Sequence, residues 1–401
     1  MRPLKELIPF EDALRMAVDI VRPIERKESV ALLDALRRVA TVNVRSRIDV
    51  PLANRAAMDG YAVVARDTSR AKKSKPVIVR RIETLHAASV PRKRVTEGHC
   101  SEIATGATLP PGANAVVRVE DTERDGNLVR IFAAARAGEN VAARGSDIQR
   151  GSIVVQTGES LTPAKVGALA AIGLDRVRVY GRPRVAILTT GDEVVAPGRS
   201  IRTGQVYDIN SNTIASVVRE NGGEPVLLGR VPDRSDALRR ALKKALANDL
   251  VACSGGSSVG ERDIVVDVLR SMGDVLFHGI AVRPGKPTAL GHVDGTPVLG
   301  MPGFPTSCLS NAYVLLAPML RRMARLPPAR PEVVEVPLAK ALVRPTGRLE
   351  FHTVRIVGGH AVPAFKESSA ITSMAHADGY IEIPADIPRL EKGQKVRVTL
   401  F

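Results

Sequence analysis

Residues 249–260 are Asp249-Leu250-Val251-Ala252-Cys253-Ser254-Gly255-Gly256-Ser257-Ser258-Val259-Gly260. The first five form a short, mostly apolar run that predicts a buried strand, and residues 263–272 have the apolar spacing of a helix. Glycines between a strand and a helix let backbone N–H groups close on an anion, and the helix start adds the positive end of its dipole. We therefore predict a phosphate-binding loop in an α/β domain.

The flanking sequence repeats this alternation. Strands are predicted at residues 185–188, 226–228, 249–253 and 297–300, with helices at 212–220, 236–247, 263–272 and 306–323. Such a pattern is typical of a parallel sheet covered by helices, in which ligands bind beyond the carboxyl ends of the strands. Thr190-Gly191-Asp192-Glu193 and Ser254-Gly255-Gly256 both fall there.

Other regions have a different character. Helices are predicted at 9–22, 29–39 and 163–172, and short β-rich pieces separated by turn residues fill 42–136. For 29–39 the expected buried face is Leu32, Leu33, Leu36 and Val39. Residues 327–331, rich in proline, predict a linker to a small β domain.

Composition limits the function classes. The 401 residues carry 58 Lys and Arg against 42 Asp and Glu, a net charge of +16, yet only 3% are aromatic. Because stacking platforms are scarce, we expect a basic surface that attracts anionic substrates, not a nucleic-acid partner. No apolar run is long enough to span a membrane, so we expect a cytoplasmic protein. Cys100, Cys253 and Cys308 are expected in the core.

Five acids lie near glycines in predicted loops: Asp59, Asp147, Glu193, Asp208 and Asp263. Each alone is typical of a cap or turn. Together they indicate a site for a hard cation such as Mg²⁺, held by one or two carboxylates and substrate oxygens.

Positive charge is expected from Arg283-Pro284-Gly285-Lys286-Pro287. Proline and glycine preset the backbone around Lys286, which favours contact with an anion, and Arg283 can add a forked donor.

One alternative is an esterase. Gly256 to Gly260 fits G-x-S-x-G around Ser258, with Asp274 and then His278 or His292 as partners. No HGGG-type segment precedes it to form an oxyanion hole, so this hypothesis is the weaker one.

Eight motifs in order resemble the MoeA family of molybdopterin molybdenumtransferases, which includes the gephyrin E domain. They are residues 51–62 with Met58-Asp59-Gly60-Tyr61, 103–112 with Thr105, 138–147 with Asp147, 190–193, 204–210 with Asp208, 254–263, 283–287 and 301–305, with Ser373 in a matching C-terminal stretch. The resemblance spans nearly the whole chain, and segments such as 344–348 are similar to archaeal members.

The resemblance implies a homodimer of elongated four-domain chains. The implied domains are a helical dimerisation domain (1–45 and 137–175), a mostly-β insert (46–136), a MogA-like doubly wound α/β domain that binds molybdopterin (176–326) and a C-terminal β-barrel-like domain (327–401).

It also implies a reaction, in which molybdate or tungstate enters adenylylated molybdopterin and AMP leaves. Glu193 and Asp263 would hold Mg²⁺, and Lys286 with Asp59 and Asp147, the last two from the partner subunit, would complete the catalytic set. The implied substrate-binding residues are Thr105, Asp208, Ser254, Gly255, Gly256, Ser257, Arg283, Pro302, Pro305 and Ser373.

Three positions depart from the family pattern: Ser257, Arg283 and Phe304. They leave the choice between molybdate and tungstate open. Two alternative functions also stay open. One is the adenylyltransferase activity of MogA-type proteins, which are also possible partners, and the other is a non-enzymatic scaffold.

Overall fold

The computed structural model describes residues 7–255 and 264–401. The chain divides into two compact units. The insert unit comprises residues 29–36 and 40–178, and the main unit comprises 1–28, 37–39 and 179–401. Each unit has its own hydrophobic clusters.

The main unit is built on a six-stranded sheet. Its strand order is β16 (Glu224–Val231), β13 (Arg184–Thr190), β17 (Leu250–Ser254), β21 (Thr296–Met301), β20 (Ala289–Val293) and β18 (Asp274–His278). The first four strands are parallel and confirm the predicted ones, whereas β20 and β18 add an antiparallel edge. Because β16 and β17 lie on opposite sides of β13, a topological switch point lies between β13 and β17, where such sheets bind ligands.

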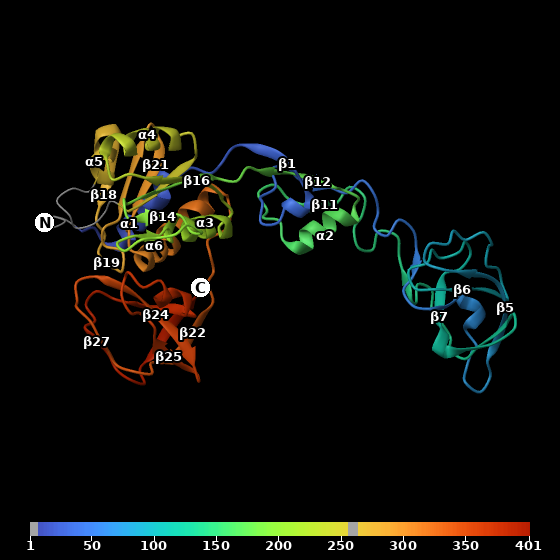
Figure 1. Ribbon diagram of the computed structural model, residues 1–401. Coiled ribbons are helices and arrows are strands. Elements are labelled where there is room, and N and C mark those ends of the chain that lie inside the picture. The colour runs from blue at the N-terminus through green and yellow to red at the C-terminus, as the bar shows by residue number, and fades with distance from the viewer. Residues whose placement is uncertain (1–6, 256–263) are drawn as a thin grey trace. The chain divides into compact units, whose positions relative to one another are not determined.

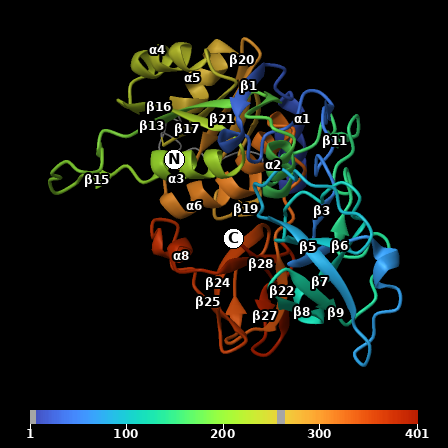
Figure 2. The same cartoon turned by 90° about the vertical axis from the view of Figure 1, so that its right-hand side faces the viewer.

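Helices cover both faces of this sheet (Figures 1 and 2). One face packs α4 (Ser235–Ala245) and α5 (Ile264–Met272). The other packs α1 (Phe10–Ile20), α3 (Asn210–Glu220) and a segment made of α6 (Pro305–Asn311), the π-helical turn η4 (Ala312–Leu316) and α7 (Ala317–Met323). These helices confirm the doubly wound arrangement.

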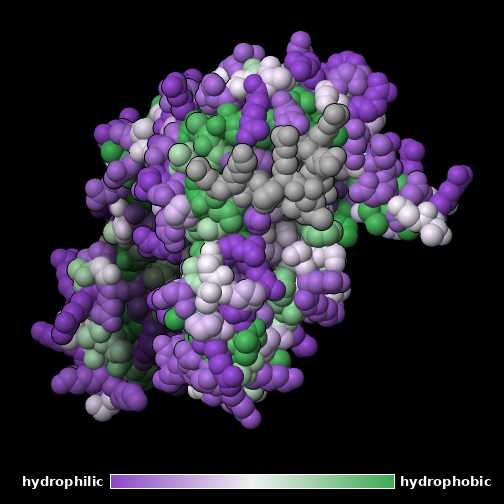
Figure 3. Space-filling model, turned by 90° about the vertical axis from the view of Figure 1, so that its left-hand side faces the viewer, coloured by the Kyte–Doolittle hydropathy of each residue, from purple (hydrophilic) through white to green (hydrophobic). Residues whose placement is uncertain are grey.

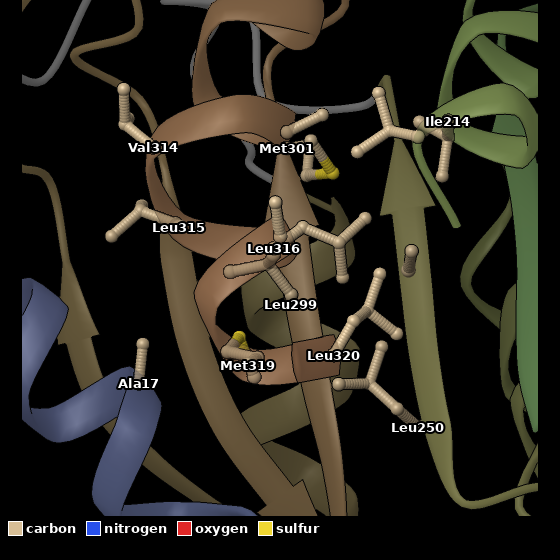
Figure 4. Packing of buried hydrophobic residues seen from close by; sticks show 14 of the residues in the cluster. Ala17, Ile214, Leu250, Leu299, Met301, Val314, Leu315, Leu316, Met319 and Leu320 are labelled. Carbon is tan, nitrogen blue, oxygen red and sulfur yellow. The ribbon is translucent and has the colours of Figure 1, made fainter. Parts of the chain in front are cut away.

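The larger core lies on the α1 and α3 side. Leu299 and Met301 of β21 pack with Leu316 and Leu320 of the helical segment, and Ile214 of α3 joins them (Figure 4). All five residues are fully buried. Full burial of such side chains contributes about 1.5–3 kcal/mol each, which holds the strand ends in place.

The C-terminal part of the main unit is a second sheet. It contains β22 (Val333–Pro337), β24 (Leu349–Val357), β25 (His360–Pro363), β26 (Gly379–Ile383) and β28 (Lys395–Leu400), beside the pair β23 (Leu342–Val343) and β27 (Arg389–Leu390) and the short α8 (Thr372–Ala375). Its edge is β19 (Val282–Arg283), which pairs in parallel with β24. The segment predicted to contact anions therefore begins on this sheet.

Aromatic contacts fasten this sheet to the helices. Phe351 lies 5.1 Å from Phe10 and 5.6 Å from Tyr380 between ring centroids, and Phe401 contacts Tyr380 and Tyr313 at 5.8 and 5.3 Å. Each such pair adds about 0.5–1.5 kcal/mol beyond area burial. The chain thus concentrates its few aromatic residues at this seam.

The insert unit is mostly β, as predicted. Its six-stranded sheet has the order β7 (Ala115–Arg118), β4 (Gly60–Val63), β6 (His99–Ile103), β5 (Val77–Leu85), β9 (Leu128–Ile131) and β8 (Thr122–Asp125). The same unit also contains α2 (Pro163–Ala171), η2 (Ala65–Thr68), η3 (Val119–Asp121) and the pairs β2 (Val44–Arg45) with β11 (Ile153–Val155) and β3 (Arg55–Ala56) with β10 (Val141–Ala142).

The helix predicted at 29–39 is wrong. Strand β1 (Lys27–Ala31) pairs there with β12 (Arg176–Tyr180), followed by the 3₁₀ turn η1 (Leu32–Asp34). Leu33 is 93% exposed, and the backbone N–H of Leu32 donates to the carbonyl of Asp175. Short apolar runs fit a helix or a strand, and the pairing with β12 decides this one.

The three cysteines are buried and unpaired, as predicted. Burial raises the pKa of each thiol to about 12.

Hydrophilic side chains cover most of the face in Figure 3. Within residues 7–255 and 264–401, no helix has the length and apolar character to cross a membrane.

Candidate functional site

Three glycine-bearing loops meet at the carboxyl ends of β13, β17 and β21. Gly255 has φ +98°, and a Cβ there would lie 2.4 Å from the carbonyl oxygen of Thr190. A Cβ on Gly303 would lie 3.5 Å from the Cα of Gly255. Only glycine allows so close a backbone approach in this conformation. The predicted convergence of these strand ends is therefore present.

A buried asparagine ties the loops together. Asn210, at the start of α3, donates from Nδ2 to the Ser254 hydroxyl and to the Gly303 carbonyl, each at 2.7 Å. Ser254 in turn donates to the carbonyl of Pro302 at 3.0 Å. Because Ser254 is 1% exposed and its hydroxyl has these partners, this hydroxyl serves the shape of the loops. Any anion contact by Ser254 would come from its backbone.

Asp208 lies before α3 and caps it. Its Oδ1 accepts from the backbone N–H of Ser211, and its Oδ2 accepts from the Thr189 hydroxyl, both at 3.0 Å. A carboxylate in this position satisfies a free N–H at a helix start. Asp208 therefore joins the end of β13 to α3.

Glu193 follows β13, just before the small pair β14 (Val194–Val195) and β15 (Val206–Tyr207). Its side chain is exposed, and its carboxylate folds over Gly191, whose added Cβ would lie 3.0 Å from either oxygen. This carboxylate is open to a cation at the end of β13.

A second acid, Asp233, lies here and was not among the residues predicted from the sequence. It follows β16, and its Oδ1 is buried without a hydrogen-bond partner among the described residues. Burial raises the pKa of Asp233, the Thr190 hydroxyl and the backbone of Asp192 oppose this rise, and the charges of Asp192 and Glu193 add to it. The position after a neighbouring parallel strand could have identified Asp233, since it obeys the same strand-end rule as Glu193.

Arg283 is the first residue of the segment 283–287, which also carries Lys286. Its NH1 lies 3.8 Å from Oε2 of Glu350, a buried carboxylate that also accepts from Arg344 Nε at 2.8 Å and pairs with His352 Nδ1 at 2.9 Å. Burial opposes the ionised form, yet the bonds from His352 and Arg344 lower the pKa of Glu350 overall. The other guanidinium nitrogens of Arg344 donate to three backbone carbonyls, whereas the Arg283 side chain is 40% exposed. Arg283 is the cation of this cluster that can face a ligand.

Lys286 is half-buried, and no carboxylate of the described residues forms an ion pair with it.

Pro302 is buried at the end of β21, and Pro305 is the first residue of α6. These prolines fix the loop that carries the exposed Phe304. Ser373 is fully buried, and its hydroxyl accepts from the backbone N–H of Lys366, so the structure gives Ser373 a role in loop shape.

In the insert unit, two predicted residues pair directly. Asp59 Oδ1 accepts from the backbone N–H of Thr105 at 2.6 Å and from its hydroxyl at 2.9 Å. These bonds lower the pKa of Asp59. Gly60 permits the close approach of β4 to β7 beside Asp59, because a Cβ there would lie 1.9 Å from the carbonyl oxygen of Val117. Both partners are exposed, so the pair is accessible to a ligand.

Asp147 is also exposed in the insert unit. Its backbone N–H donates to the carbonyl of Val50 at 3.0 Å. The neighbouring Asp49 accepts from Arg144 and from the backbone of Arg150, which lower its pKa. Asp49 supports the loop, and Asp147 is the acid left open.

Gly256, Ser257 and Asp263 lie outside the described residues, as does Ser258 of the esterase hypothesis. For that hypothesis, Asp274 pairs with His292 at 3.7 Å, but the strand register places this pair at the opposite end of the sheet from Ser254. His278 lies at the correct end without Asp274. The structure therefore disfavours the esterase.

The site is thus that of an α/β protein with glycine-bearing loops and carboxylates at its switch point. Family models match in chain order: the MoeA N-terminal region (domain I and II) over residues 8–173, the probable molybdopterin binding domain over 186–322, and the MoeA C-terminal region (domain IV) over 335–401.

Similar proteins agree with these models. Molybdopterin molybdenumtransferase 2 of Mycobacterium tuberculosis is 34% identical over 93% of this chain and 95% of its own length. The molybdopterin molybdenumtransferase of Bacillus subtilis is 30% identical over 98% and 94%. A solved molybdopterin biosynthesis MoeA protein of the archaeon Pyrococcus horikoshii has a TM-score of 0.81 at 37% identity and covers 98% of this chain and 99% of that one. The chain belongs to the MoeA family of molybdopterin molybdenumtransferases, as the motifs predicted.

Proposed function

We propose that this enzyme of molybdenum cofactor biosynthesis inserts molybdate, or tungstate, into adenylylated molybdopterin with release of AMP. The observation that carries the proposal is the convergence of Gly255, Gly303 and Thr190 beside the carboxylates of Glu193 and Asp233. Backbone N–H groups at such strand ends bind phosphate, and nearby acids bind cations.

The donor set fits Mg²⁺ in kind. Mg²⁺ prefers oxygen ligands, keeps several waters and needs only one or two carboxylates beside substrate phosphates. The described residues contain no group of three acids, histidines or cysteines that could enclose a metal, but Glu193 is open and Asp233 offers a buried oxygen without a partner. We assign these two acids to the cation, with Asp263 as the third candidate from the sequence. When bound, Mg²⁺ would neutralise charge on the phosphoanhydride.

The protein's own cations act on the same charge. Lys286 and Arg283 would bind the anionic reactants, since molybdate and both phosphates repel one another in water. The backbone of Ser254, Gly255, Gly256 and Ser257 would cradle a phosphate, and Asp208 would hold the substrate beside α3.

We also propose that the enzyme works as a homodimer in the cytoplasm, with Asp59, Thr105 and Asp147 supplied by the second copy. The exposed Asp59–Thr105 pair supports this, because it has no partner in its own unit that would use its open oxygen. Mixing inactive Glu193→Gln and inactive Asp59→Asn chains should restore part of the activity if the site is shared. Mixtures that stay inactive would place both residues in one chain's site.

The direct test replaces Glu193 with Gln and follows AMP release and metal insertion separately. Glu224→Gln is the matched control, because Glu224 is exposed at the opposite end of β16. We expect a loss of about 10²-fold or more in both steps for Glu193→Gln, comparable to removal of an electrostatic catalytic group. Rates equal to those of Glu224→Gln would refute the assignment.

The two alternatives predict different products. A MogA-type adenylyltransferase would make adenylylated molybdopterin from molybdopterin and ATP. A scaffold would still capture its partner after Glu193→Gln. The match of residues 8–173 to the MoeA N-terminal region favours the transferase over the MogA-type adenylyltransferase.

A further inference from the structure

The loop that carries Lys286 is held by hydrogen bonds to the backbone of Gly285, Lys286 and Thr288. The Lys286 carbonyl accepts from the N–H groups of Ile280 and Thr288, both at 3.0 Å. The Gly285 carbonyl accepts from the Thr288 hydroxyl at 2.7 Å. The N–H of Gly279 donates to the Thr288 carbonyl at 2.8 Å. Such a loop presents its charge without reorganisation, which is the condition for electrostatic stabilisation.

One residue outside the loop joins these bonds. Asn311, the last residue of α6, is 0% exposed, and its Nδ2 donates to the Gly285 carbonyl at 3.1 Å and to the Thr288 hydroxyl. A Cβ on Gly285 would lie 2.3 Å from Asn311 Oδ1. The side chain of Asn311 therefore packs against Gly285, where a larger residue would not fit, and hydrogen-bonds to both Gly285 and Thr288.

The backbone around Asn311 is unusual. The regular turns of α6 end at Asn311, and the π-helical turn η4 follows. A π turn rotates the residues before it relative to those after it, and such turns are frequent at functional sites. Here the residues of η4 face the core, while Asn311 contacts the loop.

We propose that Asn311 is a positioning residue for Lys286, and that α6 thereby sets where this positive charge meets the anionic substrate. The inference deepens the proposed function and rests on it for the role of Lys286. Asn311 touches no reacting group; it acts through the carbonyl of Gly285 and the hydroxyl of Thr288.

The test compares Asn311→Ala with Asn221→Ala in the full-length protein. Asn221 is a matched control because it is a buried asparagine of the same unit, 6% exposed, whose Nδ2 donates to a carbonyl within α3. Urea unfolding identifies folded variants, and Asn311→Ser, which keeps a hydroxyl donor, is the second variant if the alanine variant does not fold.

Two readouts are taken: hydrogen exchange of the Ile280 and Thr288 amides, and kcat and KM for AMP release in the presence of molybdate. We expect Asn311→Ala to speed exchange at both amides by about tenfold. We also expect it to lower kcat/KM by about tenfold. Both are the effect of losing one or two buried hydrogen bonds. Asn221→Ala should change neither by more than about twofold.

Equal values for the two alanine variants in either readout would overturn the inference, since the loop would then hold its shape, or act, without Asn311. The exchange readout does not need activity. A wild-type protein that releases no AMP, with exchange still controlled by Asn311, would leave the positioning intact and count against the proposed function.

Discussion

Asp59 and Thr105, which are far apart in the sequence, form a two-point contact: one carboxylate oxygen accepts both the backbone N–H, at 2.6 Å, and the hydroxyl, at 2.9 Å, of the same threonine. Hydrogen bonds to the charged form of a carboxylate favour that form. The contact keeps Asp59 ionised and leaves Oδ2 without a partner among the described residues.

Thr105→Val removes the hydroxyl donor and keeps the backbone donor. We expect the pKa of Asp59 to rise toward its ordinary value without reaching it, because the backbone bond is the larger cause of the lowering. A carboxyl NMR titration measures this. Thr122→Val, which removes a hydroxyl bonded to the Val119 carbonyl in the same unit, is the control. An unchanged Asp59 titration would show that the hydroxyl does not act on this carboxylate.

Gly255→Ala should damage the strand-end site through a clash. Its Cβ would lie 2.4 Å from the Thr190 carbonyl oxygen, and overpacking of this kind costs typically about 1–3 kcal/mol. Gly198→Ala separates strain from clash, since Gly198 has φ +85° and nothing within 4 Å. Urea unfolding should show a larger loss of stability for Gly255→Ala. Equal losses would mean that backbone conformation alone requires the glycine.

Glu350→Gln should destabilise the main unit in a pH-dependent way. At neutral pH the buried Arg344 loses its counter-charge, a change that costs about 3–5 kcal/mol. Because the native pKa of Glu350 is lowered, its stabilisation is fully present above its unfolded pKa, about 4.3, and is lost as pH falls through the lower native value.

The free energies of unfolding of the wild type and Glu350→Gln should therefore converge as the pH falls below the unfolded pKa of about 4.3 and through the lower native pKa. Arg344, His352 and Arg283 are the groups that face Glu350. A difference that stays constant over this range would contradict the lowered pKa.

The α/β alternation was predictable because its central strands are fully buried and lie in continuous apolar runs, bounded by glycine and proline. The segment at 29–39 was not, since its apolar residues fit a helical face equally well and only the distant partner β12 selects a strand. Pairing over such a separation leaves no local signal.

The site was predictable where a motif marks it. Glu193 and Gly255 lie beside glycines at strand ends, and both are found at the switch point. Asp233 resembles a turn former in Pro232-Asp233-Arg234, and Asn311 resembles an ordinary helix residue. Asp233 could be found only from its position after a predicted parallel strand. The contacts of Asn311 with Gly285 and Thr288 arise on folding, and no short pattern encodes them.

The central claim is that carboxylates at the ends of β13 and β16 hold the divalent cation. Mn²⁺, a paramagnetic substitute for Mg²⁺, can be titrated into the full-length protein and followed by electron paramagnetic resonance. Glu193→Gln and Asp233→Asn should each weaken its binding by about tenfold or more, the loss of one charged ligand, and Asp236→Asn on α4 should not. Wild-type affinity in both variants would contradict the account.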